Sequence, residues 1–147
     1  MRNYLLLALA AGLLTLTGLS QAAGNDTLYK SLGGKKAIVA VVNDFVGRVA
    51  ADNRINSFFQ ADAADPKRMA KFKKNLVDQI CQAAGGPCKY TGKDMKAAHA
   101  GMGITSADFD ALVGDLVASL DKFMVKDADK QALLGVLGPM KKEIVEK

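Results

Sequence analysis

Apolar residues recur every three or four positions along almost the whole chain after residue 26, which is the period of an α-helix. The segment from 35 to 52 shows the pattern clearly, because five apolar side chains form one stripe: Ile38, Val41, Val42, Phe45 and Val49. No stretch alternates apolar and polar residues as a half-buried strand does. The sequence therefore predicts an all-α domain of about six helices.

Glycines, prolines and capping residues place the first helix boundaries. A short helix is expected to stop at Gly33-Gly34, and "INSFF" at 55–59 is long enough for one helical turn only. Asp65 can cap the next helix, and Pro66 occupies its first position, where a missing N–H costs nothing. This helix is expected to end near Ala84, before a Gly-Gly-Pro sequence.

The second half predicts three more helices. Thr91 is expected to cap a short one, and Thr105 or Ser106 to start the next. Asp127 opens the last helix, which should kink at Gly138-Pro139 because proline removes one helix hydrogen bond.

The first 22 residues have the pattern of a signal peptide. Arg2 is followed by a long uncharged apolar run, and Ser20 and Ala22 stand where a signal peptidase prefers small residues. We therefore expect a domain over 23–147 in an exported, periplasmic protein with no membrane anchor after cleavage. The formal net charge is +5, but export and the few aromatic residues argue against nucleic acid as a partner.

Two cysteines, Cys81 and Cys88, are separated by a loop containing glycine and proline. In an oxidising compartment they could form a disulfide that closes a small loop, or stay as two free thiols. Spacing alone leaves both alternatives open.

Lys73 does not share the solvated face of the helix that follows Pro66. At about 100° per residue it falls about 40° from Met69, inside the apolar stripe. It either lays its methylene groups along the core with its ammonium in water, or points into a cavity and meets a ligand. Both interpretations are compatible with the sequence.

His99 is the only histidine in the chain. It shares a helix face with Met95 and Met102, at positions i, i+4 and i+7. A hydrogen-bonded structural histidine and a metal ligand both fit this spacing. One histidine is too few for a multi-histidine zinc site.

Over residues 26 to 145 the chain resembles a truncated haemoglobin of group I. The resemblance rests on "TLYKSLGG", "VNDFVGRVAADNRINSFF", "GGPCKYTGKDMKAAHAGMGIT" and the last two helices, in that order. It implies a two-over-two helical sandwich around haem b, bound without a covalent link. It also implies His99 as the proximal iron ligand, through Nε2, with Phe59 packing on the porphyrin.

The resemblance further implies which side chains surround the haem. These are Phe45, Val46, Phe58, Phe59, Met69, Phe72, Lys73, Leu76, Tyr90, Met95, His99, Ile104 and Phe109. Group I members typically have a distal tyrosine where this chain has Val46. Their distal polar residues align with Met69 and Lys73, so either of these two side chains could supply a sixth iron ligand.

The resemblance implies a globin that binds O2, NO or CO reversibly. Two alternatives are a nitric oxide dioxygenase, and a six-coordinate haem protein for electron transfer or redox sensing with a redox partner. A further alternative is a small exported helical binding module without a cofactor.

Overall fold

The computed structural model describes residues 24–147, with the side chains from Leu28 onward, and residues 1–22, where we expect the signal peptide, lie outside this range. Within it the chain is helical and has no strand. The elements are α1 (Gly24–Ser31), α2 (Gly34–Ala51), the 3-10 helix η1 (Asn56–Phe59), α3 (Gln60–Ala63), α4 (Pro66–Ala83), α5 (Met95–His99), α6 (Ser106–Lys122), α7 (Asp127–Leu137), the 3-10 helix η2 (Gly138–Met140) and α8 (Lys141–Ile144). None of the helices in 24–147 combines the length and apolar character needed to cross a membrane.

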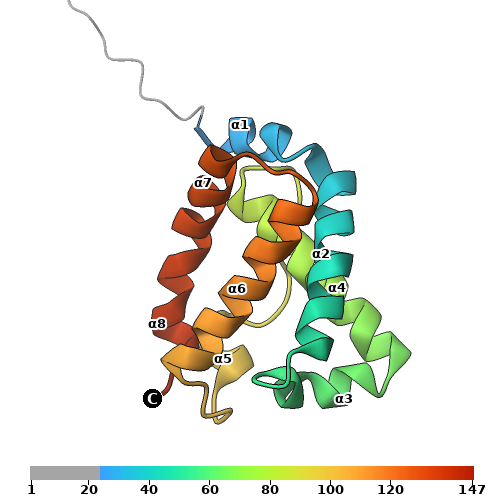
Figure 1. Cartoon of the computed structure of the whole chain (residues 1–147), viewed down its shortest axis with the longest axis vertical. Helices are drawn as coiled ribbons and strands as arrows, with labels where there is room; N and C mark the ends of the chain where they lie inside the picture. Colours follow the sequence, from blue (N-terminus) through green and yellow to red (C-terminus); the bar gives the residue numbers. More distant parts are fainter. Residues whose placement is uncertain (1–23) are drawn as a thin grey trace, which may run out of the picture.

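The four longest helices form two layers. α2 contacts both α4 and α6, and α4 also contacts α7. Figure 1 shows α6 and α7 running in opposite directions in one layer, while α4 passes behind α6 and α2. The short helix α5 lies at the lower end of the molecule and contacts α8. The predicted all-α fold with two helix pairs is thus confirmed.

Most predicted boundaries agree with the structure. Asp65 caps α4 by accepting from the backbone N–H of Lys67 (2.8 Å) and of Arg68 (3.4 Å). Thr105 caps α6 in a capping box with Asp108. The kink at Gly138-Pro139 takes the form of η2, which separates α7 from α8. The predicted cap at Thr91 is wrong.

Asp94 is the residue that caps α5. Its side chain accepts from the backbone N–H of Ala97 at 2.8 Å. Thr91 lies outside the helix, in the irregular segment that precedes it. An aspartate caps a helix at least as well as a threonine, and it stands three residues later.

The buried apolar residues form two core clusters. The larger, core cluster 1, is built mainly from α2, α4, α6 and Leu133 of α7. The smaller, core cluster 2, contains Ile104, Phe109 and Ile144, with Met95, Met102 and Met140 packed against it. Core cluster 2 therefore joins α5 and the loop after it to the C-terminal end of the chain.

A polar network on one side ties α2 to α6. Asp44 of α2 accepts from Ser119 Oγ at 2.9 Å, from Arg48 Nε at 2.8 Å and from Lys122 Nζ. These donors, with Lys122 first, hold the pKa of Asp44 well below its usual range. The network fixes the contact between the two layers without taking part in the site below.

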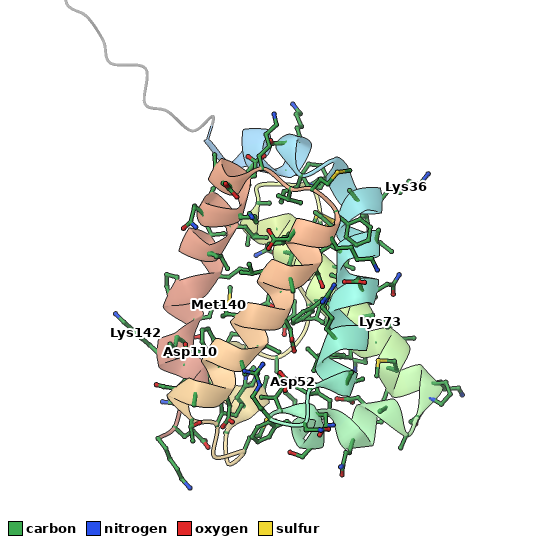
Figure 2. The ribbon with its side chains drawn as sticks, in the orientation of Figure 1. Lys36, Asp52, Lys73, Asp110, Met140 and Lys142 are labelled. Carbon is green, nitrogen blue, oxygen red and sulfur yellow. A yellow bond between two sulfur atoms is a disulfide. The ribbon has the colours of Figure 1, made fainter. Side chains whose placement is uncertain are left out.

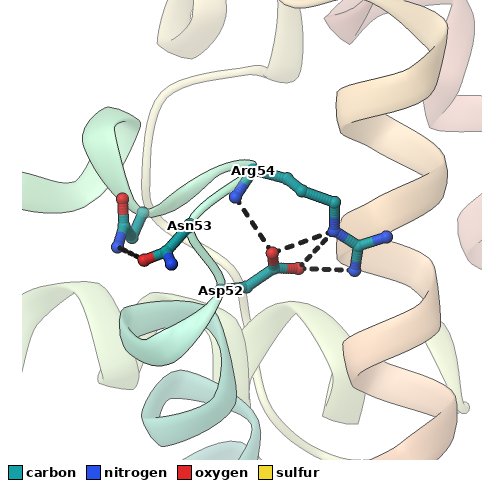
Figure 3. Close-up of polar contacts among 4 residues, drawn as sticks. Asp52, Asn53 and Arg54 are labelled. Atoms are coloured by element: carbon teal, nitrogen blue, oxygen red, sulfur yellow. Dashed lines mark hydrogen bonds and ion pairs between the residues drawn. The ribbon is translucent and has the colours of Figure 1, made fainter.

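The end of α2 carries a second cluster of charged groups. Arg54 donates to the Asp52 carboxylate through Nε (2.9 Å) and Nη2 (2.6 Å), as Figure 3 shows, and lowers the pKa of Asp52 to about 2. Burial, and then the nearby Asp52, raise the pKa of Asp115 on α6. Its Oδ2 is buried without a hydrogen-bond partner in the described part of the chain.

Candidate functional site

A cavity of about 470 Å³ lies between the two core clusters. Side chains from α2, η1, α4, α5, α6 and the C-terminal helices line it, and most of them are apolar. The volume falls in the range of about 300 to 1,000 Å³ that small-molecule and cofactor sites occupy. The fold thus places a large apolar site between its layers.

Ten of the thirteen residues that the family resemblance assigned to a cofactor site line this cavity. They are Phe45, Phe58, Phe59, Phe72, Leu76, Tyr90, Met95, His99, Ile104 and Phe109. Phe59 and Phe72 also contact each other, with ring centroids 5.4 Å apart. The structure therefore brings together aromatic side chains from η1, α4 and α6 around the one histidine.

Val46, Met69 and Lys73 do not line the cavity. Val46 is buried in core cluster 1, and Met69 packs against that cluster. Lys73 is half-buried and lies beside α2 in Figure 2, on the other side of the molecule from Met140, which lines the cavity. The structure thus does not bring the two expected distal ligands, Met69 and Lys73, to the site.

The rotation of α4 about its axis explains this difference. Phe72, Leu76 and Gln79 line the cavity and lie about 60°, 20° and 80° to one side of Met69. Lys73 lies about 40° to the other side. The periodicity identified the apolar face of α4 correctly. One side of this face packs against α2 and the other side lines the cavity, and periodicity does not distinguish the two.

His99 ends α5, and its ring is held by a backbone group of the same helix. Nδ1 lies 2.7 Å from the carbonyl oxygen of Met95. A carbonyl only accepts hydrogen bonds, so Nδ1 carries the proton in the neutral ring and Nε2 keeps its lone pair. Because His99 lines the cavity, this lone pair is the strongest metal donor there.

No group of three or more histidine, cysteine, aspartate or glutamate side chains suited to a metal ion occurs in residues 24–147. Both cysteines are joined to each other. Among the described residues, His99 is thus not part of such a cluster.

The comparisons with known proteins agree on one family. The model of the bacterial-like globins matches residues 27–146. A group 1 truncated haemoglobin of Tetrahymena pyriformis is 34% identical over 122 residues, which cover 83% of this chain and 97% of that protein. One from Mycolicibacterium paratuberculosis is 34% identical over 118 residues, covering 80% of this chain and 83% of that protein.

The chain is a bacterial-like globin.

Solved structures support the same assignment. A mutant truncated haemoglobin of Tetrahymena pyriformis in its Fe(III) form matches with a TM-score of 0.75 and 34% identity, covering 82% of this chain and 99% of that one. The 2/2 haemoglobin of Synechococcus sp. PCC 7002, in the cyanomet state with covalently attached haem, matches with a TM-score of 0.72 and 32% identity, covering 82% of this chain and 98% of that one. The protein is thus a haem-binding globin with the two-over-two fold.

The residues of this globin fit a haem. A haem iron needs a protein ligand besides the porphyrin, and one imidazole can be that ligand. His99 would supply it, because its Nδ1–Met95 hydrogen bond fixes the ring tautomer and raises the basicity of Nε2. The aromatic and aliphatic walls match the apolar faces of a porphyrin.

Sequence reasoning missed several polar side chains of the globin cavity, namely Asp62, Arg68, Asn75, Gln79 and Asp108. Gln79 is the most distinctive, because its Nε2 lies 3.2 Å from Met95 Sδ and 3.3 Å from Met140 Sδ. Thioether sulfur is a weak acceptor, so both amide hydrogens are held only by weak partners. Its place seven residues after Phe72 on the same helix face was the available signal.

Tyr90 reaches the cavity from the loop between α4 and α5. Its backbone N–H donates to Gln82 Oε1 at 2.7 Å, and its hydroxyl donates to the carbonyl of Lys93 at 2.6 Å. Burial, and then Asp94, raise the pKa of this phenol. A disulfide between Cys81 and Cys88, whose Cα atoms are 5.7 Å apart, ties the start of the loop to α4. Of the two alternatives left by the sequence, the structure therefore shows the disulfide.

Proposed function

We propose that this globin binds haem b without a covalent link and reversibly takes up a diatomic gas, O2, NO or CO. When bound, the haem iron would supply an open coordination position for such gases. The observation that carries the proposal is His99, which lines an apolar cavity with Nδ1 engaged and Nε2 free. Apolar side chains make up most of the walls around it.

The chemistry of the cysteines supports a non-covalent haem. Thioether attachment requires free cysteines, usually in a CxxCH sequence, which this chain lacks. Both Cys81 and Cys88 are engaged with each other. The haem is then held by the bond to His99 and by apolar contacts.

Two features support export to an oxidising compartment such as the periplasm. The first 22 residues have the composition of a signal peptide. A disulfide between Cys81 and Cys88 is stable in such a compartment and rare in a reducing cytosol.

Optical spectra test the proposal. Purified protein reconstituted with haem is expected to show a Soret band, and the ferrous form is expected to shift that band when CO is added. O2 should give a separate, reversible spectrum. Extraction of the haem with acidified butanone tests the non-covalent link, since covalent haem stays with the protein. Absence of any Soret band after reconstitution would refute haem binding, and a ferrous spectrum that neither O2, NO nor CO alters would refute gas binding.

A further inference from the structure

The loop that follows His99 is bound by a carboxylate from the other end of the domain. Glu146 Oε1 accepts from the backbone N–H of Gly101 at 2.6 Å, and Oε2 accepts from that of Gly103 at 2.5 Å. The backbone N–H of Glu146 also donates to the carbonyl of Ile104 at 2.9 Å. Three hydrogen bonds thus join the loop to the residue near the C-terminus.

Both glycines have the left-handed backbone that lets their N–H groups converge on one anion. Their φ angles are 77° for Gly101 and 67° for Gly103. Backbone N–H groups that converge in this way form a concave anion site, which Glu146 fills. The same N–H groups, Gly101 first, lower the pKa of Glu146, so the carboxylate is charged at neutral pH.

The bound loop is part of the haem site. It starts directly after His99, whose carbonyl accepts from the Met102 N–H at 3.1 Å. Met102 and Ile104 line the cavity beside the imidazole. The Glu146 hydrogen bonds fall on either side of Met102 and therefore fix this part of the wall.

The position of His99 depends on this loop because α5 is short. α5 has only five residues, and its packing partner is α8, which leads directly into Glu146. The Nδ1–Met95 hydrogen bond lies within α5, so it orients the ring relative to the helix but does not place the helix. The contacts of the loop and of α8 do that.

We propose that Glu146 is a positioning residue of the haem site, which holds the loop after His99 and thereby sets the orientation of the imidazole toward the iron. The inference rests on the proposed binding of haem through His99. Glu146 itself touches neither the haem nor the gas.

Resonance Raman spectra of the ferrous protein test the proposal through the iron–histidine stretching band. In Glu146→Ala all carboxylate contacts are lost, so the band is expected to shift and broaden as the imidazole takes several orientations. Haem loss to excess apomyoglobin should become about tenfold faster. Glu146→Gln keeps one accepting oxygen and should give intermediate values. In the apoproteins, amide exchange of Gly101 and Gly103 should speed up in the same order.

Glu143→Ala is the matched control, because Glu143 is exposed on α8 and its removal changes the charge equally. If Glu146→Ala matches Glu143→Ala in both the band and the haem-loss rate, the proposal is overturned. A lower thermal midpoint with an unchanged iron–histidine band also overturns it, because Glu146 would then act on stability alone. The proposal is supported if the wild type shows a Soret band and only the Glu146 variants change the iron–histidine band and the haem-loss rate. A wild type without a Soret band overturns the proposed function itself.

Discussion

His99→Ala is expected to abolish stable haem binding, so that the reconstituted variant shows little or no Soret band after gel filtration. His99 is the one histidine in the chain, and no second imidazole lies near the cavity to replace it. Both cysteines are in the disulfide. The variant keeps the apolar walls, but these contribute no bond to the iron.

Rescue by free imidazole separates the loss of the iron ligand from misfolding. Alanine leaves space where the ring stood, and a small imidazole fits there. Millimolar imidazole is therefore expected to restore a Soret band in His99→Ala, while circular dichroism shows the helices intact. A variant that holds haem as tightly as wild type without added imidazole would contradict the proximal role.

The helical fold could be predicted from the sequence because its signals are local. The spacing of apolar residues in 35–52, the Asp65-Pro66 cap and the Gly138-Pro139 kink all act within a few residues. The cap at Asp94 was missed because it depends on contacts outside the local sequence. Thr91 and Asp94 are both good caps, and the choice depends on how the preceding loop is tied to α4 through Tyr90 and Gln82.

The sequence led to His99 as a residue of the cavity, but not to the polar residues that line the cavity with it. His99 stands in a chain with no competing histidine, so alignment with the family assigned it directly. On α4, Lys73 lies inside the apolar stripe and Gln79 lies at its edge, and the helix rotation that brings Gln79 into the cavity is set by packing against α2. Periodicity gives the stripe but not which edge of it faces which neighbour.

The contact between Glu146 and the loop after His99 joins residues more than forty positions apart. Two glycines at 101 and 103 indicate a loop with unusual backbone angles, but they do not indicate which anion the loop binds. Such long-range pairing depends on how the chain returns through α8.

Removing the haem is expected to lower the free energy of unfolding by about 4 kcal/mol when free haem stands at about 1,000 times its Kd. For a domain of this size, that corresponds to a thermal midpoint lower by roughly 10 °C or more. Differential scanning calorimetry of the haem-free and the reconstituted protein measures this difference in thermal midpoint. Equal midpoints would mean that haem adds nothing to the folded state, against the proposed site.

The stability lost when the haem is removed should be concentrated in one part of the molecule. Core cluster 1 joins long helices directly, through the contacts of α2 with α4 and α6. Core cluster 2 contains only three buried residues and includes the short helices α5 and α8. A haem in this cavity would bridge the two clusters, so its removal would take away a large share of the apolar contacts of core cluster 2.

Hydrogen exchange should therefore resolve two regions in the haem-free protein. Amides of α5 and α8 are expected to exchange much faster than in the reconstituted protein, while those in the middle of α2 and α6 change less. His99→Ala should show the same pattern with haem present, because it lacks the iron ligand. Uniform acceleration along all helices would instead mean that the haem stabilises the whole domain as one cooperative unit.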